Sequence, residues 1–299
     1  MKLSICVITM NRAAQLKEAL ESCLFCELPK ETEFVVIDNA SSDDTEQTVH
    51  AVLGECGYSY YYEKLPENIG AGAGRNFYFD KAHGEFIYGM DDDAVIDFKS
   101  TPFFFTKAIE IMEKNSEIGS LATQIFDTAW NRNRQEIRGP QVSEGVYECK
   151  MFCGGSHFLR KSFFDAPPYF ANKYGYEELP PSLQITDAGG INAFCPKLIS
   201  IHKPMINKWD ISLDDGQKTS IISAASYYAI CKMTYPSICK PVLWLAMKIR
   251  FHLYLRTIPN AKNRFRTEVK AICKQYPISR KIKLSTVCKM AKTFKLSAF

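Results

Sequence analysis

Apolar runs rich in branched side chains alternate with segments of helical periodicity through the first hundred residues. The predicted strands are the runs at 3–9, 33–37, 58–62 and 85–90. A helical pattern follows each of the first three runs, with Ser41 or Ser42 as the expected cap of the second helix and residues 73–82 as the third. This alternation predicts an α/β fold with a mostly parallel sheet flanked by helices.

Polar side chains follow three of the predicted strands at their carboxyl ends. They are Thr9, Asn11 and Arg12 after the first strand, Asp38 and Asn39 after the second, and Asp91, Asp92 and Asp93 after the fourth. Ligands bind beyond the carboxyl ends of the strands in such sheets, so these groups predict a nucleotide site. Carboxylates about 5 Å apart repel by roughly 3 kcal/mol at an effective dielectric near 20. Three adjacent aspartates therefore imply either full solvation or a bound cation.

The pattern becomes less regular in the middle of the chain. Residues 151–164 carry two glycines, which bring backbone close to a neighbour, and then a short strand-to-helix pattern. Residues 174–190 place an acidic pair near the start of a helix, which Pro180 and Pro181 are expected to make late or irregular. A last strand is expected to end at His202.

The composition fits one large domain or a domain with an appendage, since the chain has 299 residues and is 46% hydrophobic. The 11 Cys follow no regular framework, which favours reduced thiols and a cytoplasmic protein. The start of the chain lacks the apolar run of a signal peptide. No stretch has the roughly 18 uncharged apolar residues of a membrane-spanning helix.

Charge is distributed unevenly along the chain. Residues 240–299 contain 15 Lys and Arg against one acid, a net of +14, which leaves 22 basic and 32 acidic residues in 1–239, a net of −10. Aromatic residues and leucines lie among the C-terminal cations, a pattern that favours an anionic membrane surface over nucleic acid as partner. The alternative is that this region packs on the acidic body or forms a dimer. The charged run at 131–138 is interpreted as an exposed, solvated loop, with a loop that faces the acceptor as the alternative.

The glycine-rich run at 68–76 does not fit a dinucleotide-binding motif. Its glycines are spaced G-x-G-x-G rather than G-x-G-x-x-G, and it follows the third strand rather than the first. A nicotinamide or flavin cofactor is therefore not expected. Arg75, at the glycine-lined start of a helix, is well suited to a diphosphate.

Four motifs together resemble the family-2 glycosyltransferases. They are SICVITMNR, VVIDNASSDDT, PENIGAGAGRN and YGMDDDA, in that family's order and spacing. The resemblance continues more weakly through GGSHFLRKSFF, YGYEE and ISIHKP, to about residue 205. It implies the GT-A fold, Rossmann-like, in a domain over 1–215 with a nucleotide-binding half (1–100) and an acceptor-binding half (101–215). A basic, mainly helical region would follow over 216–299.

The resemblance also implies roles for individual residues. The nucleotide-binding residues would be Thr9, Asn11, Arg12, Asp38, Asn39, Arg75, Asp91 and Asp92. Asp38 would accept a hydrogen bond from the N3–H of a pyrimidine base. Asp91 and Asp93 match the D-x-D motif, in which the second acid binds a divalent metal. Asp93, Asp91 and His202 are the expected ligands of Mn²⁺ or Mg²⁺, which suit oxygen ligands and a diphosphate.

On the acceptor side, the resemblance implies a carboxylate that acts as general base. Glu178 is the expected base, with Glu177 beside it and Asp187 in reserve, because Pro180 and Pro181 interrupt the family's pattern. The expected residues of the acceptor and sugar pocket are Gly154, Gly155 and Ser156, with His157.

The implied function is inverting, metal-assisted sugar transfer from a nucleoside-diphosphate sugar to a hydroxyl of a glycan or lipid-linked acceptor. The setting would be surface polysaccharide or lipopolysaccharide synthesis, by a cytoplasmic protein on the inner face of the membrane. UDP-hexose and UDP-N-acetylhexosamine are the expected donors, with dTDP-rhamnose as an alternative. A nucleotidyltransferase on the same fold is disfavoured, since no glycine-rich, Lys/Arg-containing loop follows the first strand. A non-catalytic nucleotide- or glycan-binding partner stays open, as does the oligomeric state.

Overall fold

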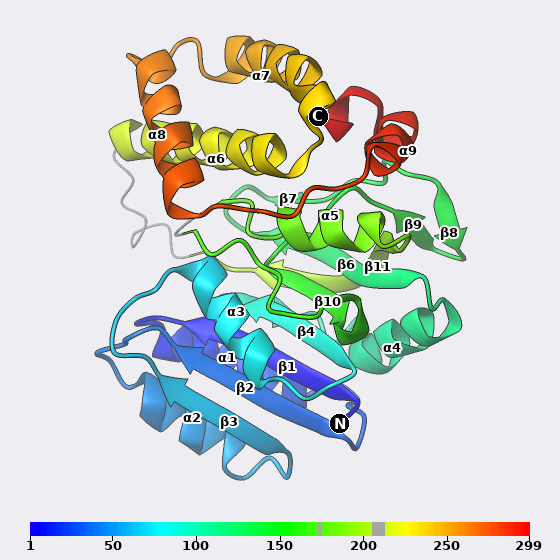
Figure 1. The fold of residues 1–299 in the computed structure, drawn as a ribbon. Helices are drawn as coiled ribbons and strands as arrows, with labels where there is room; N and C mark the ends of the chain where they lie inside the picture. Colours follow the sequence, from blue (N-terminus) through cyan, green and yellow to red (C-terminus); the bar gives the residue numbers. More distant parts are fainter. Residues whose placement is uncertain (173–174, 205–212) are drawn as a thin grey trace.

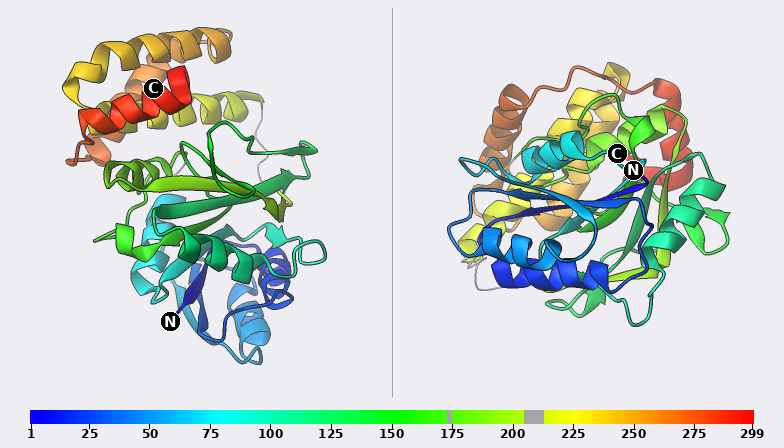
Figure 2. Two further views of the ribbon diagram at one scale, coloured as in Figure 1. Left: turned by 90° about the vertical axis from the view of Figure 1, so that its right-hand side faces the viewer. Right: turned by 90° about the horizontal axis from the view of Figure 1, so that it is seen from below.

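The computed structural model describes residues 1–172, 175–204 and 213–299, with side chains described from residue 220 in the last segment. A twisted sheet with flanking helices occupies one part of the molecule (Figure 1), and helices α6–α9 form a layer at one end of it. Figure 2 shows the same layering from the side, with the N-terminus at the end of the molecule away from these helices.

The strands of the sheet come from the whole length of the body. They are β1 (Leu3–Thr9), β2 (Thr32–Asp38), β3 (Ser59–Lys64), β4 (Phe86–Asp91), β5 (Ala94–Ile96), β6 (Ile118–Asp127), β7 (Arg132–Asn133), β8 (Gln141–Ser143), β9 (Val146–Glu148), β10 (Ser156–Arg160) and β11 (Ile191–His202). Their order is β3-β2-β1-β4-β10-β6-β11-β9-β8, with β5 on β11 and β7 on β6. The first four neighbours are parallel, whereas β10 is antiparallel to both β4 and β6.

The helices lie on both faces of the sheet and beyond its end. They are α1 (Ala13–Leu24), α2 (Thr45–Leu53), α3 (Ala71–Lys81), α4 (Phe104–Lys114), α5 (Leu179–Asp187), α6 (Leu213–Thr234), α7 (Lys240–Tyr254), α8 (Ala261–Gln275) and α9 (Leu284–Phe294). None of the helices in the described part of the chain is both long and apolar enough to cross a bilayer.

Alternating side chains of the central strands pack into two separate hydrophobic cores, one on each face of the sheet. Ile5 and Val7 of β1 pack with Leu16 and other residues of α1, whereas Cys6 points to the opposite core with Tyr78 of α3. This follows from the two-residue repeat of a strand. Burial on both faces explains why β1 and β2 read as continuous apolar runs.

Two details of the helix starts differ from the sequence prediction. The helix α2 begins at Thr45 after Asp44, so neither Ser41 nor Ser42 is its cap. The helix α5 begins at Leu179 and is not delayed by its two prolines, which occupy its first turn. Proline is tolerated there because the first turn of a helix does not use its N–H groups for internal hydrogen bonds.

The C-terminal helices share a third core with α5. Leu179 and Leu183 of α5 are buried against residues such as Tyr235 and Phe265. The domain boundary predicted between residues 215 and 216 falls within the first turn of α6. The predicted acceptor half includes residues 173–174 and 205–212, which lie outside the described residues. The division of the chain into 1–215 and 216–299 stays a prediction.

Candidate functional site

A cleft of about 2660 Å³ opens at the carboxyl ends of β1, β4 and β11. The structure brings many of the predicted site residues together along it. Those that line it are Thr9, Asn11, Arg12, Asn39, Arg75, Asp91, Asp92, Asp93, Gly154, Gly155, Glu177, Glu178 and His202. The strand ends meet here because β1 and β4 are parallel neighbours and β11 lies further along the same sheet.

The first strand supplies partners for two of the three aspartates. Thr9 Oγ1 donates a hydrogen bond to Asp92 (2.8 Å). Arg12 Nη1 lies 2.8 Å from carboxylate oxygens of both Asp92 and Asp93. Burial raises the pKa of Asp92 to about 6, against the opposing effect of the Arg12 charge. Asp92 is 5% exposed and is held by protein groups, so it braces the loop between β4 and β5.

Asp91, Asp93 and His202 form a group with the chemistry of a metal site. One potential ligand atom from each residue lies within 4.8 Å of the others. Two carboxylates and one imidazole suit Mn²⁺, and the carboxylates also suit Mg²⁺. His202 Nε2 lies 3.0 Å from Asp93 Oδ1. Burial opposes the charged form of His202, but its hydrogen bond to Asp93 and the Asp93 charge prevail and raise its pKa.

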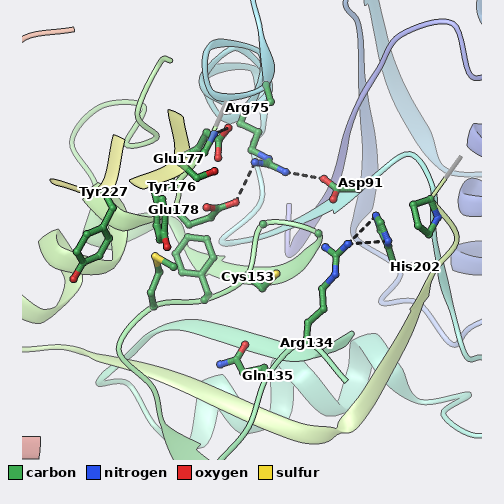
Figure 3. Close-up of a pocket in the computed structure, with 18 of the residues that line it drawn as sticks. Arg75, Asp91, Arg134, Gln135, Cys153, Tyr176, Glu177, Glu178, His202 and Tyr227 are labelled. Carbon is green, nitrogen blue, oxygen red and sulfur yellow. Dashed lines mark hydrogen bonds and ion pairs between the residues drawn. The ribbon is translucent and has the colours of Figure 1, made fainter. Parts of the chain in front are cut away.

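Asp127 and Arg134 both contact the imidazole ring of His202. Asp127, fully buried at the end of β6, lies 3.1 Å from His202 Nδ1. A carboxylate on the second imidazole nitrogen orients the ring and increases its basicity toward a metal. Arg134 places two guanidinium nitrogens 2.9 and 2.6 Å from Asp127 Oδ2. Figure 3 shows the Arg134 guanidinium against the His202 ring.

Arg75 joins the metal-site group to the acceptor-side acids. Its Nη2 lies 2.7 Å from Asp91 Oδ1, and its Nη1 lies 3.2 Å from Glu178 Oε1 (Figure 3). The side chain comes from α3 and is 6% exposed as a residue, so its charge is only weakly screened by water. The sequence prediction placed Arg75 on the base or diphosphate of the donor, whereas the structure places it between two carboxylates.

Glu178 has the properties expected of a general base. Burial, and to a smaller extent the charge of Glu177, raises the pKa of Glu178 to about 7, while Arg75 opposes the increase. Glu177 is turned differently and accepts a hydrogen bond from the Gly175 N–H (2.8 Å). Gly154 makes room for the base, because a Cβ atom there would collide with Glu178 Oε1.

Asp38 and Ser156 do not line the cleft. Both Asp38 oxygens are occupied by the protein, one by the Ser41 N–H (2.7 Å) and the other by the Tyr62 hydroxyl (2.8 Å), and the residue is 1% exposed. Its neighbour Asn39 reaches the cleft instead. Ser156 is fully buried in β10, where its hydroxyl bonds to Tyr88 (2.7 Å).

His157 also points away from the cleft and into the core. It is fully buried, stacks on Phe152 and lies 2.6 Å from the Tyr169 hydroxyl. Burial lowers the pKa of His157 to about 3, so the ring is neutral at physiological pH. Its Nδ1 lies 3.1 Å from the Gly154 carbonyl, so it helps to hold the turn of Gly154 and Gly155 before β10 rather than contacting a sugar directly.

The structure places Asp187 away from the predicted base. It lies at the last position of α5, about 13 Å along the helix from Glu178 at 1.5 Å per residue. Its Oδ1 accepts hydrogen bonds from the Lys283 N–H (2.6 Å) and the Thr286 hydroxyl (2.7 Å), at the start of α9. A role for Asp187 as reserve base is therefore not supported, since it joins α5 to the C-terminal helices.

Several residues that line the cleft were not among the predicted site residues. They are Gln124, Arg134, Lys150, Cys153, Tyr176, Tyr227 and Arg250. Tyr176 and Cys153 lie in segments that the sequence singled out for their neighbours, whereas Gln124, Lys150, Tyr227 and Arg250 lie in no motif and come from separate elements that meet only in the fold. Arg134 belongs to the charged run that was interpreted as an exposed loop, and most of that run is exposed, but the Arg134 side chain is 25% exposed and ion-paired with Asp127.

Residues 4–166 match the family model described as Glycosyl transferase family 2. A glucosyltransferase of Campylobacter jejuni, named for GalNAc(5)-diNAcBac-PP-undecaprenol, is 34% identical over 92 residues, 31% of this chain and 29% of that protein. An uncharacterized protein of Haemophilus influenzae is 25% identical over 124 residues, 41% of this chain and 65% of that protein. The chain thus spans less than two thirds of the length of either relative.

Solved structures share the fold. TarS of Staphylococcus aureus in complex with UDP-GlcNAc has a TM-score of 0.59 at 18% identity, covering 100% of this chain and 89% of that one. A mannosyltransferase of Pyrobaculum calidifontis, in complex with GDP-Man and Mn²⁺, has a TM-score of 0.61 at 15% identity, covering 97% and 79%. These likenesses confirm the predicted α/β, GT-A-like fold with a helical C-terminal region. The family match covers more than half of the chain, so this protein belongs to glycosyl transferase family 2.

Proposed function

We propose that this protein is an inverting glycosyltransferase that moves a sugar from a nucleoside-diphosphate sugar to a hydroxyl group. The observation that carries the proposal is the arrangement of Asp91, Asp93 and His202 on one side of the cleft and the buried Glu178 on the other, with Arg75 between them. A donor site and a base must face each other in this way if an acceptor hydroxyl is to attack opposite a departing diphosphate.

The donor is held at the metal-site group in this proposal. Asp91, Asp93 and His202 would hold Mn²⁺ or Mg²⁺, which when bound stabilises the charge that develops on the leaving diphosphate. Asn11, Asn39 and Arg12 would contact the nucleotide at the ends of β1 and β2. UDP-hexoses and UDP-N-acetylhexosamines are the donors to test first, and the UDP-GlcNAc complex of TarS supports that choice. dTDP-rhamnose is the alternative.

Glu178 acts as the general base in the proposed reaction. As a carboxylate it takes the proton from the acceptor hydroxyl while the new glycosidic bond forms on the face opposite the leaving group. The side chain is 12% exposed and therefore shielded from bulk water. Arg75 keeps it oriented toward the donor and, through its charge, holds part of it in the ionised form.

The test is calorimetric titration with UDP and with dTDP, each with and without Mn²⁺. We expect metal-dependent binding of one nucleotide, its loss in Asp93→Ala, and its retention in Asp80→Ala, an exposed aspartate of α3. Release of UDP from UDP-sugars, measured with a lipid-linked glycan extract, then tests turnover. Absence of binding by either nucleotide would overturn the donor site. Binding without turnover for any donor would leave a non-catalytic module.

The acceptor side is proposed to work at an anionic membrane surface, at the cytoplasmic face. Helix α7 exposes several large apolar side chains, among them Trp244 (52%), Leu253 (62%) and Tyr254 (74%). Lys248 lies among them, with its Nζ 3.9 Å from the Trp244 ring centroid. Apolar and cationic side chains mixed on one helix suit the headgroup region of a bilayer. The PP-undecaprenol in the name of the Campylobacter relative supports a lipid-linked acceptor.

Flotation with vesicles tests the membrane surface. We expect binding to phosphatidylglycerol vesicles, none to phosphatidylcholine vesicles, and a loss of binding in the double variant Trp244→Ala, Leu253→Ala. Phe25→Ala, which removes an equally exposed aromatic ring elsewhere, is the matched control. A shift from dimer to monomer in the double variant, without any effect on vesicle binding, would instead assign the face of α7 to a dimer.

A further inference from the structure

Lys150 and Arg250 approach the same tyrosine from two different elements. Lys150, in the segment between β9 and β10, donates hydrogen bonds to the Tyr227 hydroxyl (2.6 Å) and the Ser297 carbonyl (2.5 Å). The Arg250 guanidinium of α7 lies 4.5 Å from the centroid of the Tyr227 ring. Both cations are partly buried, and both line the cleft. The fold therefore holds two positive charges around one phenol.

No carboxylate neutralises this pair within the described part of the chain. Burial, Tyr227, Cys231 and Tyr176 influence the pKa of Arg250, and burial, Cys231 and Arg250 influence that of Lys150; no carboxylate is among these groups. Burial, with a smaller contribution from the Arg250 charge, lowers the pKa of Lys150 to about 8. Two like charges held together without a counterion are unfavourable, and a bound anion would remove that cost.

Other arginines of the cleft have carboxylate partners. Arg12, Arg75 and Arg134 are each ion-paired with at least one carboxylate. Arg132 also lines the cleft without an ion pair among the described residues, but it is exposed, so Lys150 and Arg250 are the half-buried cations of the cleft that have no carboxylate partner in the described part of the chain.

The cation pair lies on the side of Glu178 away from the metal-site group. Figure 3 shows Tyr227 on the far side of Glu178 from Asp91 and His202, with Tyr176 between the base and Tyr227. The rings of Tyr176 and Tyr227 lie 5.0 Å apart. A molecule whose hydroxyl reaches Glu178 would thus extend over these rings toward the two cations, away from the donor.

We propose that Lys150, Arg250 and the Tyr227 hydroxyl form a subsite for a phosphate group of the acceptor. The inference rests on the proposed function, because it takes Glu178 as the point where the acceptor hydroxyl reacts. A phosphate that joins two groups carries about one negative charge and a diphosphate link carries about two, so either would neutralise part or all of the charge of the cation pair. A guanidinium binds such a group through two parallel hydrogen bonds, and an ammonium acts as a point charge.

Two kinds of acceptor carry this chemistry. In a lipid-linked glycan the phosphate joins the sugar to its carrier, and in a phosphate-containing glycan it lies between repeating units. The shared group is the phosphate ester. Farnesyl phosphate, which carries an isoprenoid chain, is the probe for a lipid-linked glycan. Glycerol 3-phosphate, which has no such chain, is the probe for a phosphate-containing glycan.

The experiment uses the full chain saturated with UDP and Mn²⁺, so that the donor site is filled before the probe is added. We expect glycerol 3-phosphate to bind in calorimetric titration, and the Kd to rise tenfold or more in Arg250→Gln and in Lys150→Gln. Arg250→Lys, which keeps the charge, should recover part of the affinity. Lys240→Gln, which removes an exposed cation at the start of the same helix, is the matched control and should bind as the wild type does.

The outcomes separate this inference from the proposed function. Lys150 also bonds to Ser297, so UDP affinity and the thermal melting curve are recorded for each variant to detect misfolding. If wild-type protein binds UDP but neither phosphate probe, the subsite is overturned and the donor site stands. If UDP itself does not bind, the proposed function fails first. Tighter binding of farnesyl phosphate than of glycerol 3-phosphate would assign the subsite to a lipid carrier, and equal binding would assign it to a phosphate in the glycan.

Discussion

The two ends of the cleft balance their charges in opposite ways. At the end formed by β1, β4 and β11, carboxylates and cations alternate, and Arg12 alone contacts both Asp92 and Asp93. At the end formed by α6 and α7, Lys150 and Arg250 share a tyrosine and have no carboxylate in the described residues. At the first end the arginines are paired with carboxylates of the protein, and Asp91 and Asp93 among these acids are the ones proposed to hold a metal. The second end needs an anion from outside.

Removing Asp93 breaks the first end and should have the largest effect. We expect Asp93→Ala to lower the transfer rate about 10³-fold, since the loss of metal-assisted charge stabilisation amounts to about 4 kcal/mol. The measurement is UDP release with saturating donor and acceptor in Mn²⁺. Asp80→Ala should keep the wild-type rate. An Asp93→Ala rate within tenfold of wild type would show that Asp91, Asp93 and His202 do not hold a catalytic metal.

Replacing the base tests the group that separates the two ends. We expect Glu178→Gln to slow transfer about 10²- to 10³-fold while UDP affinity stays unchanged, because the amide cannot accept the hydroxyl proton. Glu177→Gln is the matched control, since this neighbour bonds to a backbone N–H instead. If Glu177→Gln proved the more damaging of the two, the roles of the pair would have to be exchanged.

The pH dependence of the rate tests whether Arg75 lowers the pKa of Glu178. With the pKa of Glu178 raised to about 7 in the free protein, we expect kcat/KM to level off above pH 7 and to fall about tenfold per pH unit below it, as the base becomes protonated. Arg75 lowers the pKa of Glu178, so Arg75→Gln should move this limb to higher pH. Rate profiles from pH 5 to 9 measure both. An acid limb at the same pH in Arg75→Gln would disconnect the two residues.

Asp187 is expected to matter for stability alone. Its two hydrogen bonds to the start of α9 resemble a helix cap, so Asp187→Ala should lower the free energy of unfolding by about 1–2 kcal/mol. Urea denaturation measures this, and kcat at a temperature where the variant is folded should stay unchanged. Thr286→Val, which removes one of the same hydrogen bonds, should lose less stability. A lost kcat with unchanged stability would return Asp187 to the list of candidate bases.

The two ends also differ in how well the sequence predicted them. The residues after β1, β2 and β4 were identified because parallel strands deliver their carboxyl ends to one edge, whatever the details of packing. The fold, the helices α1–α3 and the end of β11 at His202 followed from the same periodicity. Asp38 was the exception, because its short side chain turns back to the Ser41 N–H, a local contact that the motif does not reveal.

The other end depended on packing that no local pattern encodes. Lys150 and Arg250 lie 100 residues apart in the chain and meet only because α6 and α7 fold back over the body. Arg134 was misjudged for the same reason, since its partner Asp127 lies on β6 and its neighbour His202 on β11. The prediction of Asp187 as a reserve base was not supported because α5 begins at Leu179 and is not delayed by its prolines. Asp187 therefore lies at the far end of the helix.

The irregular pairing of β11 with β6 makes the metal-site group sensitive to chain length. Cys195 pairs with Thr123 and Ile199 pairs with the next residue, Gln124, so β11 accommodates three extra residues before His202 arrives opposite Asp127. Substitutions among residues 196–198 would leave that count intact. A deletion of one residue there would bring Lys203 opposite Asp127 and place an ammonium where the imidazole belongs. The position of His202 therefore depends on the number of residues in this segment rather than on their identity.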